Sequence, residues 1–236
     1  LHSFFTGPSL YKQPCHYSIL SMQKMSWEKL LSNQRIGTAH TPTKQTTPDA
    51  RHFFEQDSGR ILYSSAFRRL QDKTQVFPLG RNDYVRTRLT HSLEVANVGR
   101  SLGNRAGKWI FENLMDSMPH ITPDSIGSIV AAASLAHDIG NPPFGHSGET
   151  AIEVALKKHG YGNLSFEGNA QGFRLLTRIA DPMEGKGLKL TAAVLGAFMK
   201  YPCTRDYSQA VGKGGYPPVK NTLECKKFCL PSSEEY

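Results

Sequence analysis

The sequence has few of the features that mark a secreted or membrane-bound chain. Its four cysteines, Cys15, Cys203, Cys225 and Cys229, are too few and too unevenly spread for a disulfide framework in 236 residues, which favours the reducing cytoplasm. Cys225 and Cys229 are spaced as zinc ligands can be, but no second pair completes a tetrahedral site. No apolar run is long enough to cross a bilayer, and residues 1–24 lack the apolar core of a signal peptide. We therefore expect a cytoplasmic protein that does not enter a membrane.

Segments that alternate polar and apolar residues, the pattern of half-buried strands, are also lacking, as are internal repeats. Apolar residues recur instead every three or four positions, which predicts helices. After Arg51 this spacing is followed by Ile61, Leu62, Ser65, Ala66, Arg69 and Leu70. Further helices are predicted at about 85–111, 124–138, 147–159, 166–180 and 188–200. The predicted fold class is therefore mainly α.

Composition divides the chain into three regions. Residues 1–24 are irregular, and Met25 opens a helical region that we interpret as one domain over residues 25–210. Within that domain, residues 37–50 are rich in Thr and Pro and should form an exposed loop. Residues 211–236 are rich in Gly, Pro, Lys and Ser and show no periodicity, so we expect an irregular tail.

Acidic residues are in the minority. The chain has 28 Lys and Arg against 20 Asp and Glu, which gives a net charge of +8 and a pI near 9.3. Such a balance favours anionic partners, including phosphates, nucleotides, nucleic acid and membrane surfaces. Net charge does not distinguish among these anionic partners, and it is equally compatible with a basic protein that has no such partner.

Imidazole and carboxylate groups are concentrated in the stretch "AHDIGNPPFGHSGE". The helix predicted before it has an inward stripe formed by Ile126, Ile129, Val130 and Ala133. His137 continues this stripe, so its imidazole should point inward beside Asp138. Because unpaired burial of polar groups is costly, both side chains need partners. Two solutions are open, a divalent metal or a hydrogen-bond network.

A second histidine, His91, begins the apolar stripe of a separate predicted helix. That stripe continues through Val95, Val98, Leu102 and Trp109. Two inward histidines from two helices, together with one aspartate, often form a metal site in helical bundles. Arg88 lies three residues before His91, where its charge would help to neutralise a metal-bound phosphate. The alternative for Arg88 is an ordinary surface ion pair.

His146 and Glu149 form a further pair at the start of the next predicted helix. They are three residues apart, which places them on one face of that helix. A carboxylate that orients an imidazole raises its basicity, and this arrangement suits proton transfer beside a metal. Taken alone, the pair is more typical of a hydrogen bond at a helix start.

Three motifs occur in the order "SSAFRRLQDKTQVFPL", "NDYVRTRLTHSLEVANVGRSLG" and "AHDIGNPPFGHSGE". With them the chain resembles the deoxyguanosinetriphosphate triphosphohydrolase (dGTPase) family of HD-domain phosphohydrolases over about residues 25–210. The resemblance implies an HD-domain helical bundle that binds a divalent metal such as Mg, Mn or another transition metal. It also implies hydrolysis of dGTP, or of dNTPs generally, to deoxynucleoside and triphosphate.

The resemblance further assigns roles to single residues. It makes His91, His137 and Asp138 the metal ligands. It makes His146 and Glu149 the catalytic pair. Gln75 corresponds to a residue that reads the sugar 3′-hydroxyl, and Arg88 to one that contacts the phosphates. The full set implied to bind substrate is Gln75, Arg88, Asn141, Asn169, Lys200 and Tyr201.

The chain departs from the family in its last part. The family has a fourth metal ligand, an aspartate, further downstream, and neither Asp181 nor Asp206 has the expected context. We therefore expect a truncated chain, poorly active and marginally stable beside a full-length relative, whose full-length form is a homo-oligomer. Two alternatives remain. One is an HD phosphohydrolase with another nucleotide substrate, which the motifs around Gln75 and Arg88 disfavour. The other is an impaired fragment that binds nucleotide or single-stranded DNA.

Overall fold

The computed structural model describes residues 26–36, 51–75, 86–115, 118–162, 164–180 and 187–200. In these ranges every regular element is helical, and two isolated β-bridges, Arg35 with Thr191 and Thr74 with Thr87, are the extent of strand-like pairing. The mainly α prediction is therefore confirmed. The predicted irregular segments 1–24 and 211–236 lie outside the described residues. Among the helices that the structure describes, none has the length and apolarity needed to cross a bilayer.

The chain before the long helices forms short elements. They are α1 (Trp27–Leu30), α2 (Phe53–Leu62), α3 (Ser65–Arg68) and the 3-10 turn η1 (Arg69–Asp72). The continuous helix suggested by the spacing after Arg51 is thus interrupted at Tyr63. Ser64 starts α3, because its hydroxyl accepts a hydrogen bond from the Phe67 amide.

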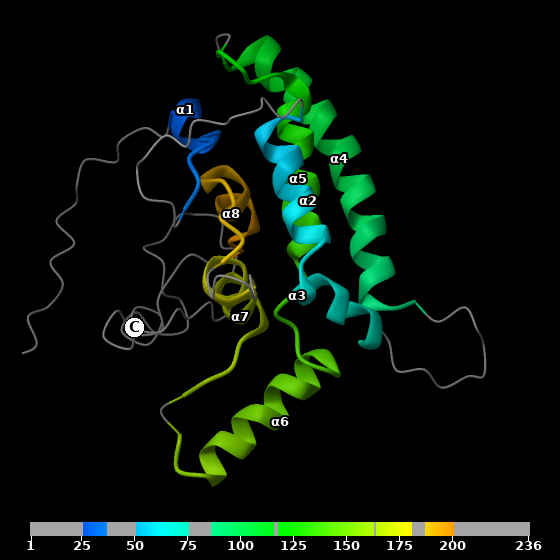
Figure 1. The fold of residues 1–236 in the computed structure, drawn as a ribbon, viewed down its shortest axis with the longest axis vertical. Coiled ribbons are helices and arrows are strands. Elements are labelled where there is room, and N and C mark those ends of the chain that lie inside the picture. Colours follow the sequence, from blue (N-terminus) through cyan, green and yellow to red (C-terminus); the bar gives the residue numbers. More distant parts are fainter. Residues whose placement is uncertain are drawn as a thin grey trace, which may run out of the picture.

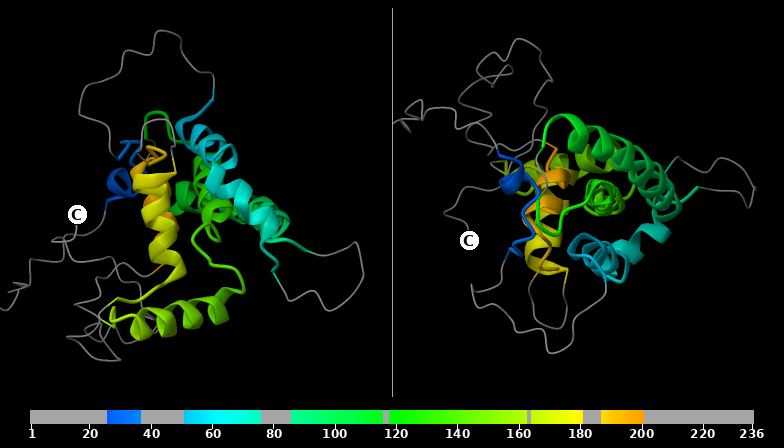
Figure 2. Two further views of the ribbon diagram at one scale, coloured as in Figure 1. Left: turned by 60° about the horizontal axis from the view of Figure 1, so that its bottom comes forward. Right: turned by 90° about the horizontal axis from the view of Figure 1, so that it is seen from above.

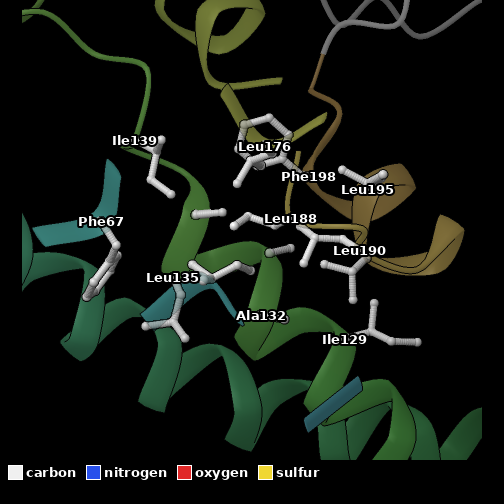
Figure 3. Close-up of a cluster of buried hydrophobic side chains, with 14 of the residues drawn as sticks. Phe67, Ile129, Ala132, Leu135, Ile139, Leu176, Leu188, Leu190, Leu195 and Phe198 are labelled. Atoms are coloured by element: carbon white, nitrogen blue, oxygen red, sulfur yellow. The ribbon is translucent and has the colours of Figure 1, made fainter. Parts of the chain in front are cut away.

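The centre of the molecule is α5 (Pro123–Ala136), which packs against α2, α4 (Arg88–Asn113) and α8 (Ala192–Phe198). Seen along its axis, α5 lies between these helices (Figure 2, right). Its alanines are small enough for neighbours to approach on several sides, and Leu135 is 7% exposed. Side chains from α5, from α8 and from the segment before α8 form the cluster shown in Figure 3. The end of α5 that leads to His137 and Asp138 is therefore held in place by a packed hydrophobic core.

The helix α4 faces α5 with small residues rather than with its predicted apolar stripe. Its buried positions are Arg88, Ser92, Ala96, Gly99, Gly103 and Gly107. The backbones approach so closely that a Cβ on Gly103 would lie 2.7 Å from the Cα of Gly127. Larger side chains would force the helices apart and weaken this packing.

The predicted inward stripe on α4 was therefore wrong over most of its length. Val98, Leu102 and Trp109 are 57%, 59% and 56% exposed, while His91 and Val95 are half-buried. The buried and apolar sets lie on adjacent sides of the helix. The side of α4 that allows close backbone packing is the one that faces α5. The apolar stripe with Val98, Leu102 and Trp109 is left exposed among the described residues.

The last helices are shorter than predicted. α5 ends at Ala136, so His137 and Asp138 lie in the turn beyond it. α7 (Gly168–Arg174) passes into a π-helical turn, η2 (Leu175–Ile179), where one α-helix was expected over 166–180. Only 192–198 of the predicted 188–200 is α-helical, as α8. Side-chain caps explain the starts, since Glu167 caps α7 and Thr191 caps α8.

The helix α6 (Gly145–Lys158) stands apart from the other helices (Figure 1). None of its residues is buried. It is joined to α5 by the turn that contains Asn141, Pro142, Pro143 and Phe144. Phe144 and Gly145 have positive φ values of 66° and 54°, and these left-handed residues redirect the chain from the end of α5 into α6.

Candidate metal and phosphate site

The end of α5 presents the His137–Asp138 pair toward the start of α4, which carries His91. One ligand atom from each of His91, His137 and Asp138 lies within 4.8 Å of the other two. The imidazole rings of the two histidines meet edge to face, with their centroids 5.3 Å apart. The structure thus brings the three side chains together, and their role as metal ligands stays a prediction. Two imidazoles and one carboxylate fit a divalent transition metal.

Hydrogen bonding fixes which nitrogen of His137 faces the cluster. Its Nδ1 lies 2.7 Å from the carbonyl oxygen of Ser134, one turn earlier. A carbonyl only accepts, so Nδ1 carries the hydrogen and, in the neutral ring, Nε2 keeps the lone pair. Nε2 lies 3.5 Å from Oδ1 of Asp138. His137 thus presents its free lone pair on the side of the carboxylate, as a metal ligand must.

Asp138 is 5% exposed and is held on both sides. Its Oδ2 accepts a hydrogen bond from Nη1 of Arg88 at 2.9 Å. Its Oδ1 accepts one from Nδ2 of Asn141 at 2.6 Å. Each oxygen of this buried carboxylate therefore has a hydrogen-bond donor that fixes its position. Arg88 is 7% exposed and pairs with this carboxylate, so the alternative of an ordinary surface ion pair does not hold for it.

A pocket of about 660 Å³ lies beside the cluster. Arg88, Asp138, Asn141 and His146 all contribute to its wall, and Gln75 faces them from the segment before α4. The buried Nε of Arg88 and the buried Oε1 of Gln75 have no hydrogen-bond partner among the described residues. An unused donor and an unused acceptor therefore lie close to the three ligand-type side chains.

His146 and Glu149 form the hydrogen bond that their spacing predicts. Nδ1 of His146 lies 2.8 Å from Oε2 of Glu149. The other carboxylate oxygen of Glu149 accepts a hydrogen bond of 2.8 Å from the backbone amide of Gly168, at the start of α7. The His146 side chain is fully exposed, so its Nε2 is open to a bound molecule. The pair is suited to moving a proton at Nε2.

Lys73 contacts one residue of the pocket wall, Asn141. Its Nζ donates a hydrogen bond of 2.7 Å to the carbonyl oxygen of Asn141. Burial lowers the pKa of the Lys73 ammonium, and the positive charges of Arg88 and Arg69 lower it further. Lys73 is not among the residues that line the pocket.

Comparison with known proteins gives the family. The model of the HD domain matches residues 88–198, a range that includes the three convergent ligand-type residues and the His146–Glu149 pair. The chain contains an HD domain over these residues, and it is similar to proteins named for deoxyguanosinetriphosphate triphosphohydrolase. It is 49% identical over 193 residues to a deoxyguanosinetriphosphate triphosphohydrolase-like protein of Synechocystis sp., an alignment that covers 75% of this chain and 43% of the relative.

Two further relatives carry the same name. The similarity to the protein of Pseudomonas aeruginosa is 46% identity over 224 residues, covering 89% of this chain and 48% of the relative. The protein of Listeria innocua is 42% identical to this chain over 198 residues, an alignment that covers 75% of this chain and 42% of the relative. The chain thus spans somewhat less than half the length of these curated relatives. The predicted resemblance is confirmed.

The structure does not bring every expected substrate residue to the HD-domain pocket. Asn169 lies in α7, where its Nδ2 bonds Oε1 of Glu167 at 2.6 Å, and it does not line the pocket. Lys200 is exposed and also lies outside the lining. Tyr201 lies outside the described residues. The substrate roles of all three remain predictions.

Sequence reasoning missed several residues at this site. Thr74, Phe144, Gly145 and Ser147 line the pocket without having been expected there. Phe144 and Gly145 were detectable in principle, because a turn between two ligand-bearing segments must approach the space between them. Lys73 gave no signal, since a lysine just before a predicted loop is normally solvated.

Proposed function

We propose that this HD domain hydrolyses a deoxynucleoside triphosphate to deoxynucleoside and inorganic triphosphate, with dGTP as the first substrate to test. One observation carries the proposal. One pocket is lined by Asp138 of the ligand-type cluster, by the buried Arg88 with an unused donor, and by His146, which Glu149 orients. The names of the relatives support this reaction over hydrolysis of other nucleotides.

The chain's own residues have distinct tasks in this reaction. Arg88 binds the phosphates through the guanidinium hydrogens that Asp138 does not use, and Gln75 accepts a hydrogen bond from the sugar hydroxyl. His91, His137 and Asp138 would hold a divalent metal, which would supply Lewis-acid catalysis of phosphate hydrolysis. Water adds to the α-phosphorus, and the bond from phosphorus to the 5′-oxygen breaks. His146, oriented by Glu149, transfers a proton at Nε2, either from the attacking water or to the leaving 5′-oxygen.

The test is to incubate the chain with each of the four dNTPs, in Mg²⁺ and in Mn²⁺, and to measure deoxynucleoside and phosphate products separately. We expect deoxynucleoside and triphosphate in equal amounts, with no diphosphate or monophosphate intermediate. Asp138→Asn is the matched control, because it keeps the size of the side chain but weakens the ligand set. Stepwise release of single phosphates would contradict the proposal. Binding of dNTP without hydrolysis would favour the nucleotide-binding alternative.

We also propose that a second copy of this chain covers the exposed stripe of α4 formed by Val98, Leu102 and Trp109. Neighbouring exposed apolar side chains on one helix side are typical of an interface. Leu102→Glu should then lower the mass measured by sedimentation at micromolar concentration. Leu93→Glu is the matched control, because Leu93 is 41% exposed and lies nine residues earlier, on the opposite side of the same helix. A monomeric wild-type chain would contradict this proposal.

A further inference from the structure

Lys73 is joined to the metal-ligand region by its backbone as well as by its side chain. Its carbonyl oxygen accepts a hydrogen bond of 2.9 Å from the amide of Arg88. Two residues on, the amide of Gln75 donates to the carbonyl of Arg86 at 3.3 Å, and Thr74 pairs with Thr87. The segment 73–75 is therefore fixed to the start of α4.

The side chain of Lys73 reaches from this fixed segment to the turn after α5. Its Nζ bonds the carbonyl oxygen of Asn141. Asn141 in turn bonds Asp138 twice, from its side chain at 2.6 Å and from its backbone amide at 3.1 Å. One ammonium group thus connects the start of α4, which carries Arg88 and His91, to the turn that carries Asp138 and leads to His146.

The placement of Lys73 separates it from the residues that contact a bound molecule. Asn141 lines the pocket, but Lys73 does not. The ammonium is half-buried and lies near the like charges of Arg88 and Arg69 and the opposite charge of Asp138. A cation is costly in such a place unless it is well hydrogen-bonded. A neutral long side chain would fill the same space without that cost, but it would lose the hydrogen bond to Asn141 and the attraction to Asp138.

We propose that Lys73 is a positioning residue, which clamps Asn141 and thereby holds Asp138 and the turn to α6 in register with Arg88 and His91. The expected effect on turnover rests on the proposed function. The hydrogen bond from Lys73 to Asn141 does not, because it is a property of the folded chain. Lys73→Met removes the donor and keeps the length of the side chain. Lys73→Arg keeps a donor. Lys108→Met is the matched control, because Lys108 is exposed on α4 and lies outside the pocket lining.

The first measurement is hydrogen exchange of the peptide 137–146, whose amides at Ile139, Asn141 and Gly145 bond within the turn. In Lys73→Met we expect faster exchange in this peptide, and wild-type exchange in Lys108→Met and Lys73→Arg. The second measurement is kinetic. Loss of residues that orient metal ligands typically costs about 10- to 100-fold in activity or metal affinity. We expect kcat to fall in that range in Lys73→Met, with KM changed less than about threefold.

The outcomes separate this inference from the proposed function. Wild-type exchange in Lys73→Met would overturn the clamp. A large rise in KM with unchanged kcat would also overturn it, because it would make Lys73 a direct substrate ligand. If the wild-type chain releases no triphosphate, the proposed function fails, and the exchange measurement alone then decides on Lys73. Faster exchange confined to Lys73→Met would still support the clamp.

Discussion

Replacing His146 by alanine should reduce the rate of triphosphate release about 10²- to 10⁴-fold, the usual contribution of a general acid or base. Metal binding should change little, because His146 is not one of the three convergent ligand-type residues. The Glu149 carboxylate accepts from both His146 and the Gly168 amide, so it stays anchored when the imidazole is removed. The variant should therefore fold and bind metal normally. Metal content and turnover are the two quantities to measure.

A histidine on the same helix provides the control for His146→Ala. His159 is exposed at the other end of α6, where its amide closes the last turn. His159→Ala removes an imidazole that does not line the pocket. It should leave turnover within about twofold of the wild-type value. If His146→Ala lost metal and rate in equal proportion, His146 would be a ligand or a structural residue, and the proton-transfer role would be wrong.

The sequence was sufficient to predict the parts of the site that depend on local spacing. The pairing of His146 with Glu149 follows from a three-residue separation at a helix start, and the structure has that bond. The convergence of His137 and Asp138 with His91 followed from the expected inward direction of two helices. His91 nevertheless lies at the edge of the buried face of α4, and the apolar residues thought to accompany it are exposed.

The error on α4 has a general physical cause. Apolar spacing indicates which residues would be stabilised by burial, but it carries no information on how closely two helix axes approach. Gly99 and Gly103 allow the axis of α4 to lie against α5, so that a Cβ on Gly99 would be 2.8 Å from Oγ of Ser134. The close approach of the two backbones adds dispersion contacts that larger side chains at Gly99 and Gly103 would prevent. The small residues Gly99 and Gly103, and not the apolar ones, indicated which side of α4 faces α5.

Bonds between distant parts of the chain were beyond sequence reasoning. The clearest example is Asp57 in α2, which is 0% exposed. Its Oδ2 accepts hydrogen bonds from the amide and the hydroxyl of Thr191, at 2.8 and 2.7 Å. Its Oδ1 pairs with Arg35, whose guanidinium also donates to the carbonyl of Lys189 at 2.8 Å. Nothing in a single sequence pairs residue 57 with residues 35 and 191.

This network supports the site from the far side of the core. Thr191 caps α8, and α8 packs against α5, the helix that leads into the turn with His137 and Asp138. Asp57→Ala would leave the Arg35 guanidinium, 17% exposed, without its carboxylate and would leave two Thr191 donors unpaired. Removing one partner of a buried ion pair costs about 3–5 kcal/mol. Because native domains are stable by only about 5–15 kcal/mol, much of the free energy of unfolding should be lost.

Chemical denaturation followed by circular dichroism measures this loss, and two further variants make it decisive. Glu94→Ala breaks the exposed pair with Arg86, whose side chains are 58% and 54% accessible, and should cost less than about 1 kcal/mol. The double variant Arg35→Met, Asp57→Leu leaves no unpaired buried charge and should be more stable than Asp57→Ala. An Asp57→Ala loss no larger than that of Glu94→Ala would show that the network does not hold α8 against α5. The packing of α8 against α5 would then depend on apolar contacts alone.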